Sequence, residues 1–229
     1  MNLPEPGEYI DIHTHDSSPA GGIFAVENLM AHENIQPENI TARAFTAGIH
    51  PWHLNVNNRE ELLKYVRKVS DNPNLIALGE AGFDKLKGPS MQLQRSTFEE
   101  QVTIAIEKQK PLVIHCVRAW DELLAAHKNM KPATPWLVHG FRGKKELALQ
   151  LIKRGMFLSF WFDFVLRPES ADLLRFLPKE RIFLETDGAD VDIKSIYGKV
   201  ANDLGCSEEE LKSIIHSNFA KLFKSEQYD

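Results

Sequence analysis

Near its start the chain reads Tyr9-Ile10-Asp11-Ile12-His13-Thr14-His15, a short apolar stretch that ends in two histidines separated by one residue. Its β-branched and aromatic residues predict a strand over Tyr9–His13. Successive side chains of a strand point to opposite faces, so His13 and His15 are expected on the same side. Two imidazoles that project together from a strand end can bind one metal ion. The pair therefore predicts part of a metal site.

Short strand-like runs alternate with longer helix-like segments through the rest of the chain. Strands are predicted at Tyr9–His13, Gly22–Leu29, Arg43–Ile49, Leu75–Gly79, Pro111–His115, Pro135–His139, Met156–Phe160 and Arg181–Glu185, with a short helix at Val26–His32 as an alternative for the second. A rhythm of roughly one strand per 29 residues is typical of βα units around a parallel sheet. We predict an α/β fold, a somewhat shortened (β/α)8 TIM barrel that forms a single domain over residues 1–229.

The predicted helices carry apolar residues at helical spacing. They include segments 92–108 and 144–154. Capping boxes are predicted at Asn58 with Glu61 and at Ser207 with Glu210, the second at the start of a terminal helix.

The composition indicates a protein without a membrane anchor or a strong basic surface. The net charge of -5 argues against tight non-specific binding to duplex nucleic acid. No apolar run approaches the roughly 20 residues that span a bilayer, and the first residues do not resemble a secretory signal. Two cysteines form no disulfide framework, so a cytoplasmic location is expected. No obligate protein partner is indicated.

Several predicted strands run into a residue that can bind metal. In a parallel barrel the C-terminal ends of the strands converge on one rim, so six distant residues are expected to meet there: His13, His15, Glu80, His115, His139 and Asp187. Four imidazoles and two carboxylates suit a divalent transition metal, or two ions if one carboxylate bridges them. Each residue alone has a structural alternative, such as a hydrogen-bonded histidine or a carboxylate that caps a loop. Their recurrence at the same structural point favours metal binding.

These residues lie in motifs that run nearly end to end through the chain: DIHTH at 11–15, GIHPW at 48–52, ALGEAGFD at 77–84, LVIHCVRAW at 112–120, LVHGFRG at 137–143, FLETDGAD at 183–190 and NFAKLF at 218–223. The set resembles the TatD family of metal-dependent hydrolases, within the wider amidohydrolase-like barrels. The resemblance implies a deoxyribonuclease supported by magnesium or manganese. It also implies that Glu80 bridges two ions, with His13, His15 and Asp187 on one ion and His115 and His139 on the other.

We predict a phosphodiesterase that uses a metal-activated hydroxide at the C-terminal rim of the barrel, with two divalent ions (Mg, Mn or Zn) as cofactor. Coordination by metal lowers the pKa of water from 15.7 to about 7. Asp187 is expected to orient the attacking water and accept its proton, and Glu80 is the second catalytic residue. The expected substrate is single-stranded DNA or DNA ends.

Three further residues are candidates for the substrate side of the site. His50 is predicted to contact a phosphate, or to stabilise the turn before Pro51. Arg118 is predicted to bind phosphate bidentately, or to form a salt bridge at a helix start. Asp84 is predicted to orient a ligand histidine. Three basic residues, Arg142, Lys144 and Lys145, are predicted to add positive charge near the site. The alternative is that they form the solvated start of a helix.

Two loops depart from the family pattern, and the substrate assignment depends on such loops. The family usually follows its first motif with Leu-Asp, whereas this chain has Asp16-Ser17-Ser18, and Gly188-Ala189-Asp190 replaces a proline-containing loop. A hydrolase of a small amide, lactone or phosphoester is therefore an alternative, as is a non-catalytic metal-binding relative. Related barrels often bridge their metals with a carboxylated lysine at the fourth strand. No lysine stands in the strand before His115, which favours the TatD-like interpretation.

Overall fold

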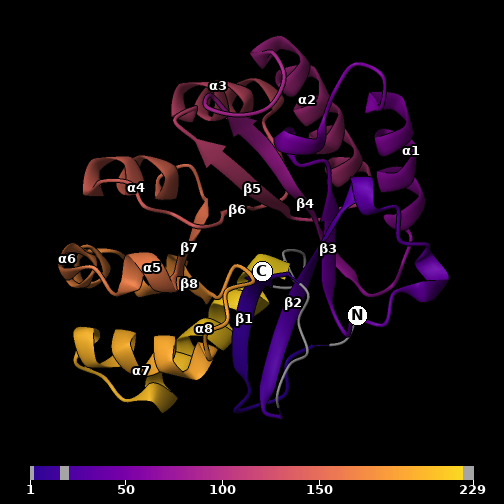
Figure 1. Cartoon of the computed structure of the whole chain (residues 1–229). Coiled ribbons are helices and arrows are strands. Elements are labelled where there is room, and N and C mark those ends of the chain that lie inside the picture. The colour runs from indigo at the N-terminus through magenta and orange to yellow at the C-terminus, as the bar shows by residue number, and fades with distance from the viewer. Residues whose placement is uncertain (1–2, 16–20, 224–229) are drawn as a thin grey trace. The chain divides into compact units, whose positions relative to one another are not determined.

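The computed structural model of the chain describes residues 3–15 and 21–223, and it contains all eight predicted strands (Figure 1). They are β1 (Tyr9–Thr14), β2 (Ile23–Met30), β3 (Phe45–Gly48), β4 (Leu75–Asp84), β5 (Leu112–Val117), β6 (Trp136–Val138), β7 (Phe157–Trp161) and β8 (Ile182–Glu185). The sheet order follows the chain order, and the pairs β1–β2, β3–β4, β4–β5 and β7–β8 are parallel. Strands in this order, with α-helices between the strands from β3 onward, are the pattern of a (β/α)8 fold. The second segment is a strand, as predicted, and not a helix.

The α-helices of the described residues are α1 (Arg59–Val69), α2 (Met91–Glu107), α3 (Trp120–Met130), α4 (Lys145–Ile152), α5 (Phe162–Val165), α6 (Pro168–Phe176), α7 (Ile193–Leu204) and α8 (Glu208–Phe223). None of them is long and apolar enough to cross a lipid bilayer. The capping box of α8 is confirmed, because the Ser207 N–H donates to the Glu210 carboxylate and the Glu210 N–H donates to the Ser207 hydroxyl. The predicted capping box of α1 is wrong. The Asn58 side-chain oxygen instead accepts from the Asn55 N–H at 2.8 Å and so stabilises the preceding turn.

The chain divides into two compact units. The first comprises residues 28–137, and the second comprises the residues before 28 and after 137. In the first unit α1, α2 and α3 pack on β3, β4 and β5 (Figure 1). In the second unit β8 lies against both β7 and β1, and α7 and α8 pack on β1 and β8. The single domain over residues 1–229 stays a prediction.

Strand β4 extends beyond its predicted end. It continues past Gly79 to Asp84, and all of its residues are buried. The small and apolar residues after Glu80 continue the parallel pairing with β5, where Gly82 lies opposite His115. Glu80 therefore lies inside a strand and not at its end. A carboxylate held inside a strand has little freedom to rotate away from its neighbours.

Gly82 marks a close approach between β4 and β5. A Cβ added at this residue would lie 1.9 Å from the carbonyl oxygen of His115, which cannot move without its backbone. We expect Gly82→Ala to lower the free energy of unfolding by roughly 3 kcal/mol. Gly21→Ala is the matched control, because nothing lies within 4 Å of its added Cβ. Urea unfolding of the two variants measures the difference, and equal midpoints would contradict the close approach.

Candidate metal centre

The second unit brings together His13, His15 and Asp187. The Nε2 atoms of His13 and His15 lie 3.6 and 3.7 Å from Oδ1 of Asp187, and one ligand atom from each residue lies within 4.8 Å of the others. His13 is fully buried, whereas the side chains of His15 and Asp187 are about one quarter exposed at 25% and 24%. Two imidazoles and a carboxylate at this spacing can bind one divalent ion, with an open side for water or substrate.

The backbone around Asp187 explains how this residue reaches the histidines. The Asp187 N–H donates to the carbonyl oxygen of His13 at 3.1 Å, so the end of β8 is fixed beside β1. Asp187 adopts a left-handed conformation with φ of 54°, and a Cβ added at Gly188 would lie 3.0 Å from that of His15. The segment Asp16-Ser17-Ser18, which departs from the family pattern, lies outside the described residues.

Asp11 connects β1 to the end of β8 by side-chain hydrogen bonds. Its carboxylate accepts from the N–H of Thr186 at 3.0 Å and from the Thr186 hydroxyl at 2.6 Å. Burial raises the pKa of Asp11 to about 7, against the lowering effect of these hydrogen bonds. Sequence reasoning missed this role, because it depends on a partner 175 residues away.

His139 lies in the same unit and is held by Glu185. Nδ1 of His139 lies 3.5 Å from Oε1 of Glu185, which also accepts from the Gly140 N–H at 2.7 Å. The Ser159 hydroxyl donates to Oε2 at 2.5 Å. Burial opposes ionisation of Glu185, but the neighbouring His139 and Ser159 hold its pKa below the usual range. Such a carboxylate fixes the orientation of a histidine ring. Glu185 was not predicted as a functional residue, although its spacing of two from Asp187 was a signal.

The first unit forms a separate cluster from His50, Glu80 and His115, all buried. Oε1 of Glu80 lies 2.7 Å from Nδ1 of His115 and 3.1 Å from Nε2 of His50. The backbone N–H of Glu80 donates to the side-chain oxygen of Asn28 at 2.9 Å, which fixes the strand at this residue. Glu80 and His115 are thus brought together as predicted. Their combination with the residues of the second unit, and the grouping of His115 with His139 on one ion, stay predictions.

His50 has the hydrogen bonds of a donor and not of a metal ligand. Its Nδ1 accepts from the backbone N–H of Trp52 at 3.1 Å. A neutral ring that accepts at Nδ1 carries its proton on Nε2, so this N–H faces Glu80. The ring can therefore donate to a carboxylate or to a substrate oxygen. The predicted alternative, a structural role at the turn before Pro51, is also present in the bond to Trp52.

Asp84 has the contacts of a residue that orients its neighbours. Its Oδ2 accepts from the indole N–H of Trp52 at 2.6 Å and lies 3.4 Å from Nε2 of His115. Its Oδ1 accepts from the backbone N–H groups of Leu86 and Lys87 at 2.7 and 2.9 Å. Burial would raise the pKa of Asp84, but these hydrogen bonds outweigh it and hold the pKa below its usual value. Both oxygens are engaged by the protein, so the geometry favours orientation of His115 over contact with substrate.

Arg118 lies after β5 and is exposed, with a left-handed φ of 51°. Within the described ranges no ion pair is formed by this residue, so its predicted salt bridge has no support. The side chain projects from the segment that follows His115. Contact with a phosphate stays a prediction.

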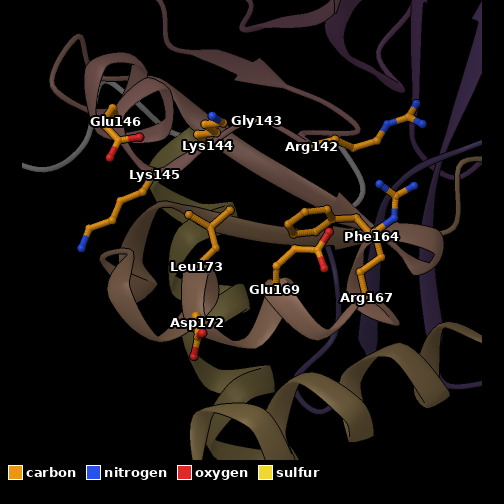
Figure 2. Close-up of a pocket in the computed structure, with 10 residues that line it drawn as sticks. All are labelled: Arg142, Gly143, Lys144, Lys145, Glu146, Phe164, Arg167, Glu169, Asp172 and Leu173. Atoms are coloured by element: carbon orange, nitrogen blue, oxygen red, sulfur yellow. The ribbon is translucent and has the colours of Figure 1, made fainter.

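Figure 2 shows a pocket of about 520 Å³ in the second unit, between the segment after His139 and helices α5 and α6. The guanidinium of Arg142 lies 4.7 Å from the centroid of the Trp161 ring, and Arg167 pairs with Asp163. Both arginines point toward the same side in this view. Carboxylates also line the pocket, so it is not a uniformly basic surface. Its lining includes Arg142, Lys144, Lys145, Glu146, Arg167, Glu169 and Asp172.

Comparisons with known proteins place the chain in a family. The family described as TatD related DNase matches residues 27–224, a range that starts after His13 and His15 and includes the other four predicted ligands. The 3'-5' ssDNA/RNA exonuclease TatD of Citrobacter koseri is 32% identical over 165 residues, which are 68% of this chain and 63% of that protein. This chain thus spans less than two thirds of that relative. The uncharacterized metal-dependent hydrolase YcfH of Escherichia coli K12 is 28% identical over 196 residues, 78% of this chain and 73% of that protein.

Solved structures give the fold. YJJV, a TatD homolog from Escherichia coli K12, has a TM-score of 0.78 at 20% identity and covers 96% of this chain and 99% of its own. A TatD family hydrolase from Entamoeba histolytica has a TM-score of 0.75 at 17% identity, and the match covers 94% of this chain and 98% of that chain. The predicted fold class, a (β/α)8 barrel, is confirmed. The predicted enzyme class, a hydrolase that acts on ester bonds, is the class that the family description names, and the chain belongs to this TatD related DNase family.

Proposed function

We propose that this chain is a metal-dependent phosphodiesterase that hydrolyses single-stranded nucleic acid or its ends. The observation that carries the proposal is the His13, His15 and Asp187 cluster, in which two imidazoles and a carboxylate face one another at less than 4.8 Å. Nitrogen and oxygen donors of this kind suit Mn, Zn and similar divalent ions. A buried histidine beside partly exposed partners leaves one side of the cluster open to a substrate oxygen.

His13, His15 and Asp187 would hold a divalent ion, which would supply Lewis acidity and lower the pKa of water to about 7. The chain's own residues orient the reacting groups. Asp187 accepts the proton of the attacking water through its carboxylate, which is about one quarter exposed at 24%. Its backbone N–H donates to the carbonyl oxygen of His13, which restrains the main chain that carries this carboxylate. Oε1 of Glu185 lies 3.5 Å from Nδ1 of His139 and can orient that ring.

The first unit has a proposed ligand pair and a hydrogen-bond donor of its own. Glu80 and His115 are the proposed ligands, and Asp84 orients the His115 ring from its other nitrogen. His50 donates from Nε2 and can stabilise negative charge on a phosphoryl oxygen. The name of the Citrobacter relative, an exonuclease of single-stranded DNA and RNA, supports a nucleic-acid substrate for this chain.

Removal of metal is the direct test of this function. We expect that dialysis against a chelator lowers hydrolysis of a labelled single-stranded oligonucleotide at least about 1000-fold, and that manganese, magnesium or zinc restores it. A simple phosphodiester and a panel of amides and lactones are assayed in parallel. Full activity after chelation, or hydrolysis of the amides and lactones alone, would overturn the proposal.

A further inference from the structure

Trp52 lies beside the first-unit cluster and has no role in the chemistry above. Of the four tryptophans, all within the described residues, Trp52 alone is exposed, with 42% of its surface open to solvent. Its ring centroid lies 4.9 Å from that of His50 and 5.8 Å from that of His115. A large aromatic surface thus lies beside two residues of the proposed site.

The indole is fixed although it is exposed. Its N–H donates to Oδ2 of Asp84 at 2.6 Å, and its backbone N–H donates to His50 at 3.1 Å. Pro51 precedes it and restricts the backbone. A ring held at its edge in this way loses little conformational freedom when a ligand packs on its face.

The surroundings of the ring favour an anionic partner with a planar group. The ammonium of Lys87 lies 3.7 Å from the centroid of the Trp52 ring, in a cation–π contact. At an exposed residue such a contact is weaker than the stacking of a nucleobase on an aromatic ring. The lysine stem is flexible, so its charge can move from the ring face to a neighbouring phosphate.

We propose that Trp52 is the platform on which the base next to the scissile phosphodiester stacks, with Lys87 contacting the adjoining phosphate. This inference rests on the proposed function and specifies its substrate as a strand whose base is unpaired at the cleavage site. Stacking accepts any base, because every base has a π face. Trp52 is thus a positioning residue with little sequence preference.

The test compares two single-stranded oligonucleotides, one with a terminal base and one with a terminal abasic residue. For the intact protein we expect KM to be about tenfold lower for the oligonucleotide with the base, the effect of one base–aromatic stack. In Trp52→Leu the ratio of the two KM values falls to about one, because no aromatic ring remains for the base to stack on. Trp52→Phe keeps a ring and retains most of the difference in KM. Trp52→Phe also lacks the indole N–H, so it separates loss of the ring from loss of the hydrogen bond to Asp84.

Phe176→Leu is the matched control. Phe176 is 41% exposed and has the ammonium of Lys145 at 3.2 Å from its ring centroid, but it lies on α6 and has no place in the proposed site. We expect this variant to keep the full preference for the terminal base. Rates are normalised to hydrolysis of a small phosphodiester without a base, which separates changes at the reacting phosphate from changes in base binding.

A binding measurement without turnover completes the test. In the presence of a chelator, the oligonucleotide with a base is expected to quench the fluorescence of the intact protein, and most of this quenching should be absent in Trp52→Phe. Metal-dependent hydrolysis that shows no preference for the base, or equal loss in Phe176→Leu, would overturn the stacking role alone. A protein that hydrolyses no phosphodiester with any metal would overturn the proposed function and this inference with it.

Discussion

Asp187→Asn is expected to lower kcat on a phosphodiester by about 10²- to 10⁴-fold, the range for loss of a general base. The substitution removes the negative charge that faces His13 and His15 at 3.6 and 3.7 Å. It also removes the group that accepts the proton of the attacking water. An amide of the same shape can perform neither task.

The same variant is expected to fold normally, for reasons visible in its backbone. Asparagine adopts the left-handed conformation more readily than most residues, so the φ of 54° is retained. The N–H that donates to His13 belongs to the backbone and is unchanged. Thermal unfolding with and without manganese should therefore give a wild-type midpoint without metal and a smaller stabilisation with it.

Asp190→Asn is the control for this experiment. Asp190 is exposed, lies in the same loop and undergoes the same chemical change, but no candidate ligand group contains it. We expect its kcat to stay within about twofold of the wild type, as for most surface substitutions. Near-normal turnover in Asp187→Asn would exclude this residue as the base.

Strand order and most of the predicted ligands could be inferred from the sequence because they depend on local patterns. Each apolar run of four to six residues gives a buried strand, and the βα rhythm gives their order. A histidine or carboxylate at the end of such a run is visible without a structure, as with His13 and Asp187. The first contacts within each unit, such as His115 with Glu80, followed from this placement.

The residues that hold the ligands in place could not be inferred in the same way. Asp11 binds Thr186 and Glu185 binds the Gly140 N–H, and both contacts join segments at least 45 residues apart. The predicted end of β4 at Gly79 was wrong because the pairing of Gly82 with His115 depends on the neighbouring strand. Propensity within one segment carries no information about such partners.

Glu80→Gln is the second substitution with a large expected effect, and we expect it to lower kcat by about 1000-fold. The reason is that several kcal/mol of charge stabilisation by metal would be lost. Oε1 of Glu80 lies 2.7 Å from His115 and 3.1 Å from His50, and a neutral amide at this place binds a divalent ion poorly. Glu107→Gln, on the exposed end of α2, is the control and should retain full activity.

The number of manganese ions bound by each variant distinguishes two roles for Glu80. If Glu80 bridges two ions, as the family resemblance implies, Glu80→Gln loses more than one ion per chain, whereas Asp187→Asn weakens only one. If Glu80 serves only its own cluster, Glu80→Gln keeps one tightly bound ion, because His13, His15 and Asp187 provide an independent ligand set. Titration calorimetry and elemental analysis give this number directly. Two tightly bound ions in Glu80→Gln would exclude Glu80 as a metal ligand, since a bridging or a terminal carboxylate must each reduce the count.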